Sequence, residues 1–391
     1  MKLIINRFPK ANFKWIAEGF SFFLGFMALN YLDWPQLRFW RVKGPGGRFE
    51  DLQGILELGD CYQNIGIEVF KYEGNCTGYM YGKFLLDTFN FLHIREHHSY
   101  SIGIGLLLLL SLALSFLFRS VNFKFSYILK AAIVFSPPIL LLAERGNFDT
   151  VIFLLILASS LLLIINLPEI AILPLISASL MKFYTLPSLV ALLILKFGIR
   201  MKVILVTTSA VAGYLILQDL GRVQAGFRQL WYAQFGMSVW GRYANEVQLF
   251  QLNETTINLI GIFIFGLTIL LISRSPRIPK HILLSDQSFY QTRNITFFLL
   301  FSTHLACFTL GMSYDYRLIF IIGASGALLS SGCNLSVHQV RKIIIFLTCM
   351  VWCSYNSGQL QIIGNVMLEF LTAWYLIVTY NHLKSFVRKS D

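Results

Sequence analysis

The sequence carries little charge for its length. Only 13% of its 391 residues are Asp, Glu, Lys or Arg, whereas 56% are hydrophobic, and the mean hydropathy is +0.63. A soluble domain cannot bury so much apolar surface. The composition therefore predicts an all-α polytopic membrane protein.

Motifs of soluble enzymes are missing as well. The chain has no phosphate-binding loop, no glycine pattern of a dinucleotide site and no Gly-x-Ser-x-Gly turn. It also has no nucleic-acid-binding module. Its net charge of +12 comes mainly from Lys and Arg residues on the predicted cytoplasmic side of the spans. We therefore expect no nucleic-acid partner, and a function that depends on residues near the membrane surface.

Cysteine is scarce, with six residues in the chain. None has the mixed Cys and His spacing of a zinc site, so no metal site is predicted. Cys61 and Cys76 lie in the same predicted outer loop, where an oxidising compartment would allow a disulfide. Two unpaired thiols are the alternative.

Long apolar runs define the organisation of the chain. Hydropathy predicts about twelve transmembrane or re-entrant helices in a single integral membrane domain, residues 1–391. The first run is long enough to span and has no small-residue cleavage site after it, so we expect a first spanning helix rather than a signal peptide. The predicted segments are residues 15–31, 101–118, 126–143, 149–166, 170–181, 185–197, 202–218, 256–273, 295–312, 318–332, 343–356 and 363–380.

The distribution of basic residues predicts the orientation. If the N-terminus is cytoplasmic, alternating spans place most Lys and Arg residues inside and leave the outer segments slightly acidic, as the positive-inside rule requires. Both termini are then cytoplasmic, and two long loops, residues 32–100 and 219–255, are extracytoplasmic. The first loop is rich in aromatic residues, so we expect helices in it that lie along the membrane interface.

Asp51 is the first candidate site residue. It precedes apolar residues at positions 52, 55, 56 and 58, a spacing typical of a helix that begins near Asp51. One interpretation is an N-cap of that helix. The other is a general base, at the junction of the outer loop and the membrane, that takes a proton from an acceptor hydroxyl. Glu50 and Asp60 are weaker candidates for the same role.

Arg145 and Lys182 are candidate phosphate ligands. Arg145 lies at a predicted membrane boundary beside a helix that starts near Asn147–Asp149, and helix starts favour anions. A structural ion pair with Glu144 or Asp149 is the alternative for Arg145. Lys182 lies between two short apolar runs, where an ammonium below the membrane surface needs water or an anionic partner. Snorkelling to the surface is its alternative.

A third set of basic and aromatic residues lies near the C-terminal half. Arg317 follows Asp315 and Tyr316 at the outer end of a predicted span, and Arg228 lies in the second outer loop. Cations beside aromatic rings suit a lipid headgroup, a diphosphate or a sugar. For Arg317 a local ion pair with Asp315 is the alternative.

Taken together, these segments resemble the GT-C superfamily of membrane glycosyltransferases, and glycosyltransferase family 87 within it. The resemblance is carried by Asp51-Leu52 early in the first outer loop, the cysteine pair with Tyr79-Met80-Tyr81, Glu144 to Asp149, Leu180 to Tyr184, and Asp315-Tyr316-Arg317. The tyrosine-proline element of the family is replaced here by Tyr81-Gly82-Lys83.

The resemblance implies transfer of a monosaccharide from a polyprenyl-phosphate carrier to a lipid-linked or cell-surface glycan. The reaction would take place at the outer face of the cytoplasmic membrane. Asp51 would be the base, and Arg145, Lys182, Arg317 and Arg228 would contact the substrates. Attack opposite the phosphate would invert the anomeric centre.

Hydrogen bonds from Asn147 and Tyr316 to hydroxyl or phosphate groups are also expected. No cofactor is expected, because basic side chains alone can meet the charge of a phosphate leaving group. Partners would be the polyprenyl-phosphate sugar, the acceptor and membrane lipids. Two alternatives stay open from the sequence: a transporter or flippase of a lipid-linked sugar, and a glycan polymerase of the O-antigen type.

Overall fold

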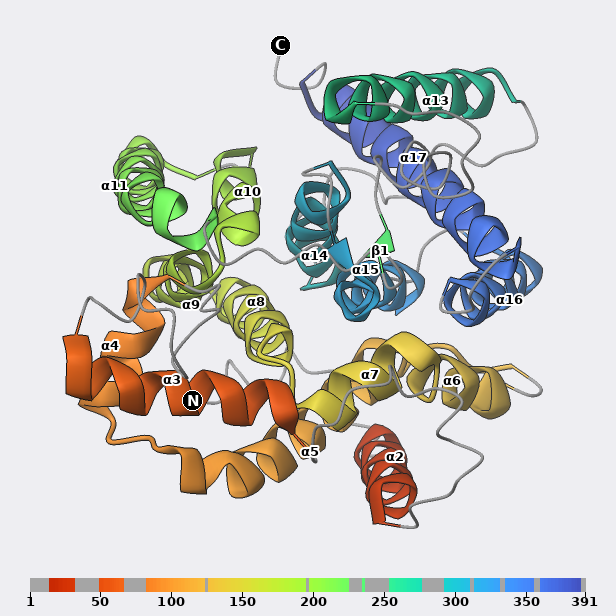
Figure 1. Ribbon diagram of the computed structural model, residues 1–391. Helices are drawn as coiled ribbons and strands as arrows, with labels where there is room; N and C mark the ends of the chain where they lie inside the picture. Colours follow the sequence, from red (N-terminus) through yellow and green to blue (C-terminus); the bar gives the residue numbers. More distant parts are fainter. Residues whose placement is uncertain are drawn as a thin grey trace. The chain divides into compact units, whose positions relative to one another are not determined.

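The computed structural model describes eleven ranges of the chain. These ranges are residues 14–31, 49–66, 82–123, 126–194, 197–224, 234–235, 253–275, 292–309, 313–330, 335–354 and 359–387. They divide between two compact units, the first covering residues 1–119 and 140–228 and the second covering residues 120–139 and 229–391. Figure 1 shows the elements, which are almost all helices.

In the described part of the first unit the helices run from α2 to α11. Their bounds are α2 Lys14–Tyr31, α3 Glu50–Ile65, α4 Lys83–Phe91, η3 Glu96–His98, α5 Ser99–Leu117, α8 Asp149–Ile164, α9 Pro168–Met181, η4 Phe183–Thr185, α10 Leu186–Ala191, η5 Leu192–Ile194 and α11 Ile199–Gln224. Within this unit α2 packs on α5, α8 packs on α9, and α3 packs on α4.

The second unit contains the C-terminal helices and a short strand pair. Its elements are α6 Ser126–Val134, β1 Gln234–Phe235, α13 Glu254–Arg274, α14 Thr292–Thr309, β2 Ser313–Tyr314, η8 Asp315–Leu318, α15 Ile319–Ser330, α16 Val337–Cys353 and α17 Gln359–Val387. The strands are antiparallel, with Gln234 opposite Tyr314. Helix α14 packs on α15, and α17 packs on both α16 and α13.

Helix α7, Pro137–Arg145, begins at a break in the third predicted segment. The sequence analysis treats residues 126–143 as one span, but α6 and α7 are separate helices that meet at an angle of 49°. Pro137 and Pro138 cause the break, because proline has no N–H for the helical ladder and its ring clashes with the preceding turn. Both prolines fit at the start of α7, where those N–H groups have no helical partner.

Several helices are suited to a membrane. In the described ranges four helices are long and apolar enough to cross a bilayer, or five if the α6–α7 pair counts as one span. The four lie in Glu96–Leu117, Ile199–Gln218, Thr255–Arg274 and Leu360–Lys384. Shorter apolar helices include α8, α9, α14 and α15. The chain is therefore a helical membrane protein, and the described residues of each predicted segment are mostly helical, but twelve complete spans stay a prediction.

In the described part of the predicted first outer loop, residues 50–65 and 83–91 form the α-helices α3 and α4. The buried face of α3 consists of Leu52, Ile55 and Leu56, which confirms the helical spacing seen in the sequence. Tyr62 on α3 donates a hydrogen bond to Asp87 on α4 over 2.9 Å. Partial burial is the main cause that raises the pKa of Tyr62, and this hydrogen bond is the second cause. The pKa of Lys83 is also raised, mainly by its hydrogen bond to Asp87. The bond between Tyr62 and Asp87 holds α3 against α4, whereas the contact between Lys83 and Asp87 lies within α4.

Gly364 allows α17 to approach the end of α16. A Cβ atom on Gly364 would lie 2.5 Å from the Cα atom of Ser354, which is buried. We expect Gly364→Ala to lower the free energy of unfolding by about 1–3 kcal/mol, because overpacking forces the two backbones apart. Thermal unfolding of the purified protein in detergent measures the change.

Gly266→Ala provides the matched control. Gly266 lies in α13 and has no atom within 4 Å of an added Cβ, so alanine should leave the stability unchanged or raise it slightly. Equal unfolding temperatures for the two variants would contradict the packing role of Gly364.

Candidate functional site

The start of α3 is fixed by Phe49. This residue has φ of 60°, in the left-handed region, and its N–H donates to the carbonyl of Glu144 at the end of α7 over 2.8 Å. Its ring is buried against two glycines. A Cβ atom added to Gly103 would lie 2.5 Å from the ring, and a Cβ atom added to Gly146 would lie 2.9 Å from it. A left-handed phenylalanine is unusual, and the close backbone and ring contacts hold it in place. They bring the first turn of α3 to the α7–α8 connection.

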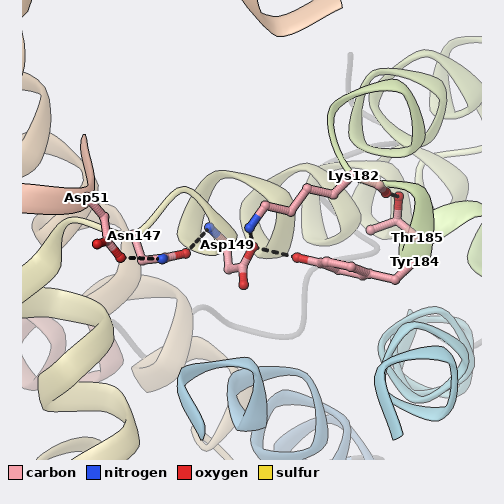
Figure 2. A network of polar contacts seen from close by, with 6 residues as sticks. All are labelled: Asp51, Asn147, Asp149, Lys182, Tyr184 and Thr185. Atoms are coloured by element: carbon pink, nitrogen blue, oxygen red, sulfur yellow. Dashed lines mark hydrogen bonds and ion pairs between the residues drawn. The ribbon is translucent and has the colours of Figure 1, made fainter. Parts of the chain in front are cut away.

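Asp51 lies in that first turn and is held by two donors. The Nε atom of Arg145 donates to Asp51 Oδ1 over 2.6 Å, and Arg145 Nη2 lies 2.5 Å from the same oxygen. The Nδ2 atom of Asn147 donates to Asp51 Oδ2 over 2.6 Å. Arg145 Nη2 also lies 3.6 Å from Glu50 Oε2. The sequence segments around positions 51 and 145–147 therefore meet in space, as Figure 2 shows for Asp51 and Asn147.

The N-cap interpretation of Asp51 is wrong. Helix α3 starts at Glu50 and its N-cap is Phe49, without a side-chain hydrogen bond. The Asp51 side chain instead bonds residues 94 and 96 positions away in the sequence. The physical reason is the strong charge-assisted bond to the Arg145 fork, which a backbone N–H of its own helix cannot match.

Asn147 connects Asp51 to the first turn of α8. While its amide nitrogen donates to Asp51, its Oδ1 accepts from the backbone N–H of Asp149 over 2.9 Å. Asn147 is buried, so both ends of its amide are used inside the protein. This placement satisfies one of the free N–H groups at the start of α8.

Asp149 forms the buried end of the same network. Lys182 makes an ion pair with Asp149 Oδ1, and the hydroxyl of Tyr184 donates to that oxygen over 2.5 Å. The side chain of Lys182 is only 7% exposed and that of Asp149 is fully buried. Figure 2 shows Lys182 and Tyr184 both pointing at Asp149. Lys182 therefore has the anionic partner that a buried ammonium needs, and its ammonium does not snorkel to the surface.

The hairpin of α8 and α9 produces this pairing. Asp149 is the first residue of α8, Lys182 follows the last residue of α9, and the two helices pack together. The turn between them contains Asn166 with φ of 61°. Each charge also lies at the favourable end of its helix, the acid at an N-terminus and the base at a C-terminus.

A tight turn after α9 holds the backbone of Lys182. Lys182 is extended, and its carbonyl accepts from the backbone N–H and the hydroxyl of Thr185 over 3.2 and 2.9 Å. The Thr185 hydroxyl is also 3.3 Å from that of Ser179 on α9. Thr185 is buried and appears beside Tyr184 in Figure 2. The backbone of Lys182 is thus held by Thr185, and its side chain is held by Asp149.

In the sequence analysis Asp149 is considered only as a possible ion-pair partner of Arg145, and Tyr184 is assigned no role. A signal for Asp149 was present, since Asn166 follows Asp149 by 166 − 149 = 17 residues and precedes Lys182 by 182 − 166 = 16 residues. Two helices of nearly equal length joined by a short turn bring such positions together. Tyr184 has no comparable signal, because its position depends on the η4 turn.

The other predicted site residues belong to the second unit or lie outside the described residues. Arg317 is half-buried in η8, directly after β2. Tyr316 is in the same turn, but its side chain lies outside what the structure describes, as does all of Arg228. The structure therefore unites Asp51, Arg145, Asn147 and Lys182 within the first unit and describes Arg317 separately.

Of the two cysteines in the predicted disulfide, the structure describes only Cys61. Cys61 on α3 is disulfide-bonded, whereas the other described cysteines, Cys307, Cys349 and Cys353, are not part of a disulfide. Cys76 lies outside the described residues. In the described part of the chain no group of three or more His, Cys, Asp and Glu side chains is placed to hold a metal ion.

The fold and the buried network are those of a helical membrane protein that encloses ionic side chains among apolar helices. In comparisons with known proteins, no family model, curated protein or solved structure matches the chain.

The ion pair between Asp149 and Lys182 has a testable energetic signature. Lys182→Met leaves a buried carboxylate without its cation, and Asp149→Asn leaves a buried ammonium without its anion, so each change should cost about 3–5 kcal/mol of stability. The double variant should be more stable than either single variant, because it buries neither charge alone. Thermal unfolding in detergent provides the double-mutant cycle.

Lys83→Met is the control for this cycle. The ion pair of Lys83 with Asp87 is exposed, with side chains 38% and 49% accessible, so its loss should cost less than about 1 kcal/mol. Additive effects in the Asp149 and Lys182 cycle would show that the two side chains do not stabilise each other.

Proposed function

We propose that the protein is a membrane glycosyltransferase that uses a polyprenyl-phosphate sugar, with Asp51 as the general base. The main support is the carboxylate of Asp51, which is held by Arg145 and Asn147 at the start of α3 and is 18% exposed. A base must be both oriented and accessible to an acceptor hydroxyl. The resemblance to GT-C enzymes assigns the base to this same residue.

The exposed end of the network suits substrates better than the buried end. The Arg145 side chain is 27% exposed and Glu50 is 38% exposed, whereas Lys182 and Asp149 are enclosed. We therefore assign the phosphate of the donor to Arg145 and a positioning role to Lys182. Lys182 holds Asp149, and the Asp149 backbone holds the Asn147 amide that orients Asp51.

An exchange of partners by Arg145 links donor binding to catalysis. In the structure its guanidinium neutralises Asp51. A phosphate is also a strong acceptor for an arginine fork, so an incoming donor competes with Asp51 for Arg145. When the guanidinium turns to the phosphate, Asp51 Oδ1 is released to take the proton of the acceptor hydroxyl. The hydroxyl oxygen then attacks the anomeric carbon as the bond to the phosphate breaks, and Arg145 stabilises the charge on the leaving phosphate.

We further propose that the site faces outward from the cytoplasmic membrane, with both termini inside. The distribution of Lys and Arg supports this orientation. The acceptor is then a lipid-linked or surface glycan, and the sugar donor reaches the site from within the outer leaflet.

Transport of a lipid-linked sugar is the second candidate. The fully buried Asp149 with Lys182 and Tyr184 favours it, because ionisable groups enclosed among apolar helices are typical of transport pathways. An assay with protein in sealed bilayers and radiolabelled polyprenyl-phosphate mannose, glucose or arabinose separates the candidates. A transferase gives a new labelled product with a membrane lipid extract, whereas a flippase changes only the leaflet of the label.

Asp51→Asn tests the base in the same assay. Asparagine keeps the shape but accepts no proton, so transfer should fall by about 10²- to 10⁴-fold while membrane insertion stays normal. Glu57→Gln, on the exposed face of α3, should retain the activity of the unchanged protein. Activity of Asp51→Asn close to that of Glu57→Gln would remove Asp51 from the mechanism.

Chelation tests the expected independence from metals. Arg145 can supply positive charge to a phosphate leaving group without an ion, so transfer should persist in excess EDTA. The measurement is the initial rate with and without chelator. Loss of activity that Mg²⁺ or Mn²⁺ restores would show that the site needs a cation that the side chains do not replace.

A further inference from the structure

An exposed tyrosine adjoins the Asp51 segment through the ring of Phe49. Tyr100 lies in the first turn of α5, and its ring centroid is 6.0 Å from that of Phe49, with the two rings edge to face at 60°. Phe49 is the N-cap residue of α3 and is only 4% exposed, whereas Tyr100 is 44% exposed. The aromatic pair therefore presents the Tyr100 ring at the surface, beside the helix that carries the proposed base.

The Phe49 ring also contacts the segment that carries Arg145. A Cβ atom on Gly103, which follows Tyr100 by about one turn of α5, would lie 2.5 Å from Cδ2 of this ring. A Cβ atom on Gly146 would lie 2.9 Å from Cδ1, on the other side of the ring. Gly146 directly follows Arg145, whose guanidinium holds the proposed base. The first turn of α5 and the Arg145 segment therefore pack against the same ring.

Tyr100 lies near the membrane boundary. The span that contains it starts at Glu96, so Tyr100 is 100 − 96 = 4 residues from that end, or about 6 Å at 1.5 Å per residue. A polyprenyl chain dissolves in the hydrocarbon layer, so the phosphate and sugar that it carries lie at the boundary of that layer. The Tyr100 ring is thus at the depth of a lipid-linked sugar.

Three partly exposed side chains match the groups that meet in a sugar-phosphate transfer. Arg145, 27% exposed, suits the phosphate, and Asp51, 18% exposed, suits the acceptor hydroxyl. A sugar ring also has faces made of C–H groups, which are weakly positive and apolar. An aromatic face is negative and apolar, so it attracts such C–H groups and removes them from water. Tyr100 provides such a face.

We propose that Tyr100 is a substrate-binding residue whose exposed ring stacks on a C–H face of the donor sugar. This inference rests on the proposed function and adds a contact for the sugar itself. Phe49 supports the Tyr100 ring from the buried side, so little conformational freedom is lost when the sugar binds. Stacking depends on the sugar ring and not on the phosphate, so the contact distinguishes a carrier with a sugar from a carrier without one.

Binding of the carrier with and without its sugar tests this assignment. The full protein in lipid nanodiscs, without acceptor, is titrated with radiolabelled polyprenyl-phosphate mannose, glucose and arabinose, and with polyprenyl phosphate. Arg145 contacts the phosphate in every carrier, so the ratio of the Kd values isolates the sugar. We expect Tyr100→Ala to weaken binding of the best-bound glycosylated carrier by about tenfold and to leave the Kd of polyprenyl phosphate unchanged. Tyr100→Phe keeps the ring and should keep the ratio.

Phe91→Ala is the matched control for the loss of an exposed aromatic ring from the same predicted loop. Phe91 is the last residue of α4 and is 82% exposed, so its removal should leave every Kd unchanged. A Tyr100→Ala variant that weakens both kinds of carrier equally, as the loss of a membrane anchor would, overturns the assignment. A ratio that stays the same in Tyr100→Ala, or that falls equally in Phe91→Ala, overturns it as well.

The titration and the transfer assay together separate this inference from the proposed function. A labelled product, combined with an unchanged ratio in Tyr100→Ala, contradicts the stacking contact and leaves the transferase in place. A ratio that Tyr100→Ala lowers, without a labelled product from the unchanged protein, supports the sugar contact and contradicts transfer. An unchanged protein that binds no glycosylated carrier contradicts both.

Discussion

The ion pair between Asp149 and Lys182 is the interaction on which the arrangement of the first unit depends. Both side chains are almost fully buried, so neither charge can be kept without the other. The pair joins the N-terminal end of α8 to the turn after α9, and through Asn147 it also positions the carboxylate of Asp51. The buried charge of Lys182 thus determines the position of the Asp51 carboxylate, the partly exposed group that we propose as the base.

Much of the fold could be predicted from the sequence, because apolar runs bounded by charge or proline become helices in a membrane protein. The positions of α8, α9 and α13 follow from such runs, and the spacing of Leu52, Ile55 and Leu56 gave α3. The break between α6 and α7 was missed, although Pro137 marks it. Whether a proline ends a helix or only bends a longer span depends on neighbouring helices that compensate the lost hydrogen bonds, and a local pattern does not contain them.

The candidate site could be predicted in part. Charged residues at membrane boundaries pointed to Asp51, Arg145 and Lys182, and the structure links all three through one polar network. Figure 2 shows its part from Asp51 to Lys182. Their partners were harder to find. The N-cap assignment of Asp51 failed because it considered only the local helix, whereas the side chain bonds groups more than ninety residues away. To identify Asp149 as the partner of Lys182, one must know where α8 and α9 begin and end and how they align. The residue types at positions 149 and 182 do not contain that information.

The near-equal lengths of α8 and α9 constrain how this protein can change. Each residue added to or removed from a helix turns everything beyond it by about 100° and moves it by about 1.5 Å. One insertion in α8 or α9 would therefore point the lysine away from its acid. Substitutions on the outer face of the hairpin leave that register intact. In descendants of this chain, the lengths of these two helices should vary together or not at all, even where their apolar side chains diverge freely.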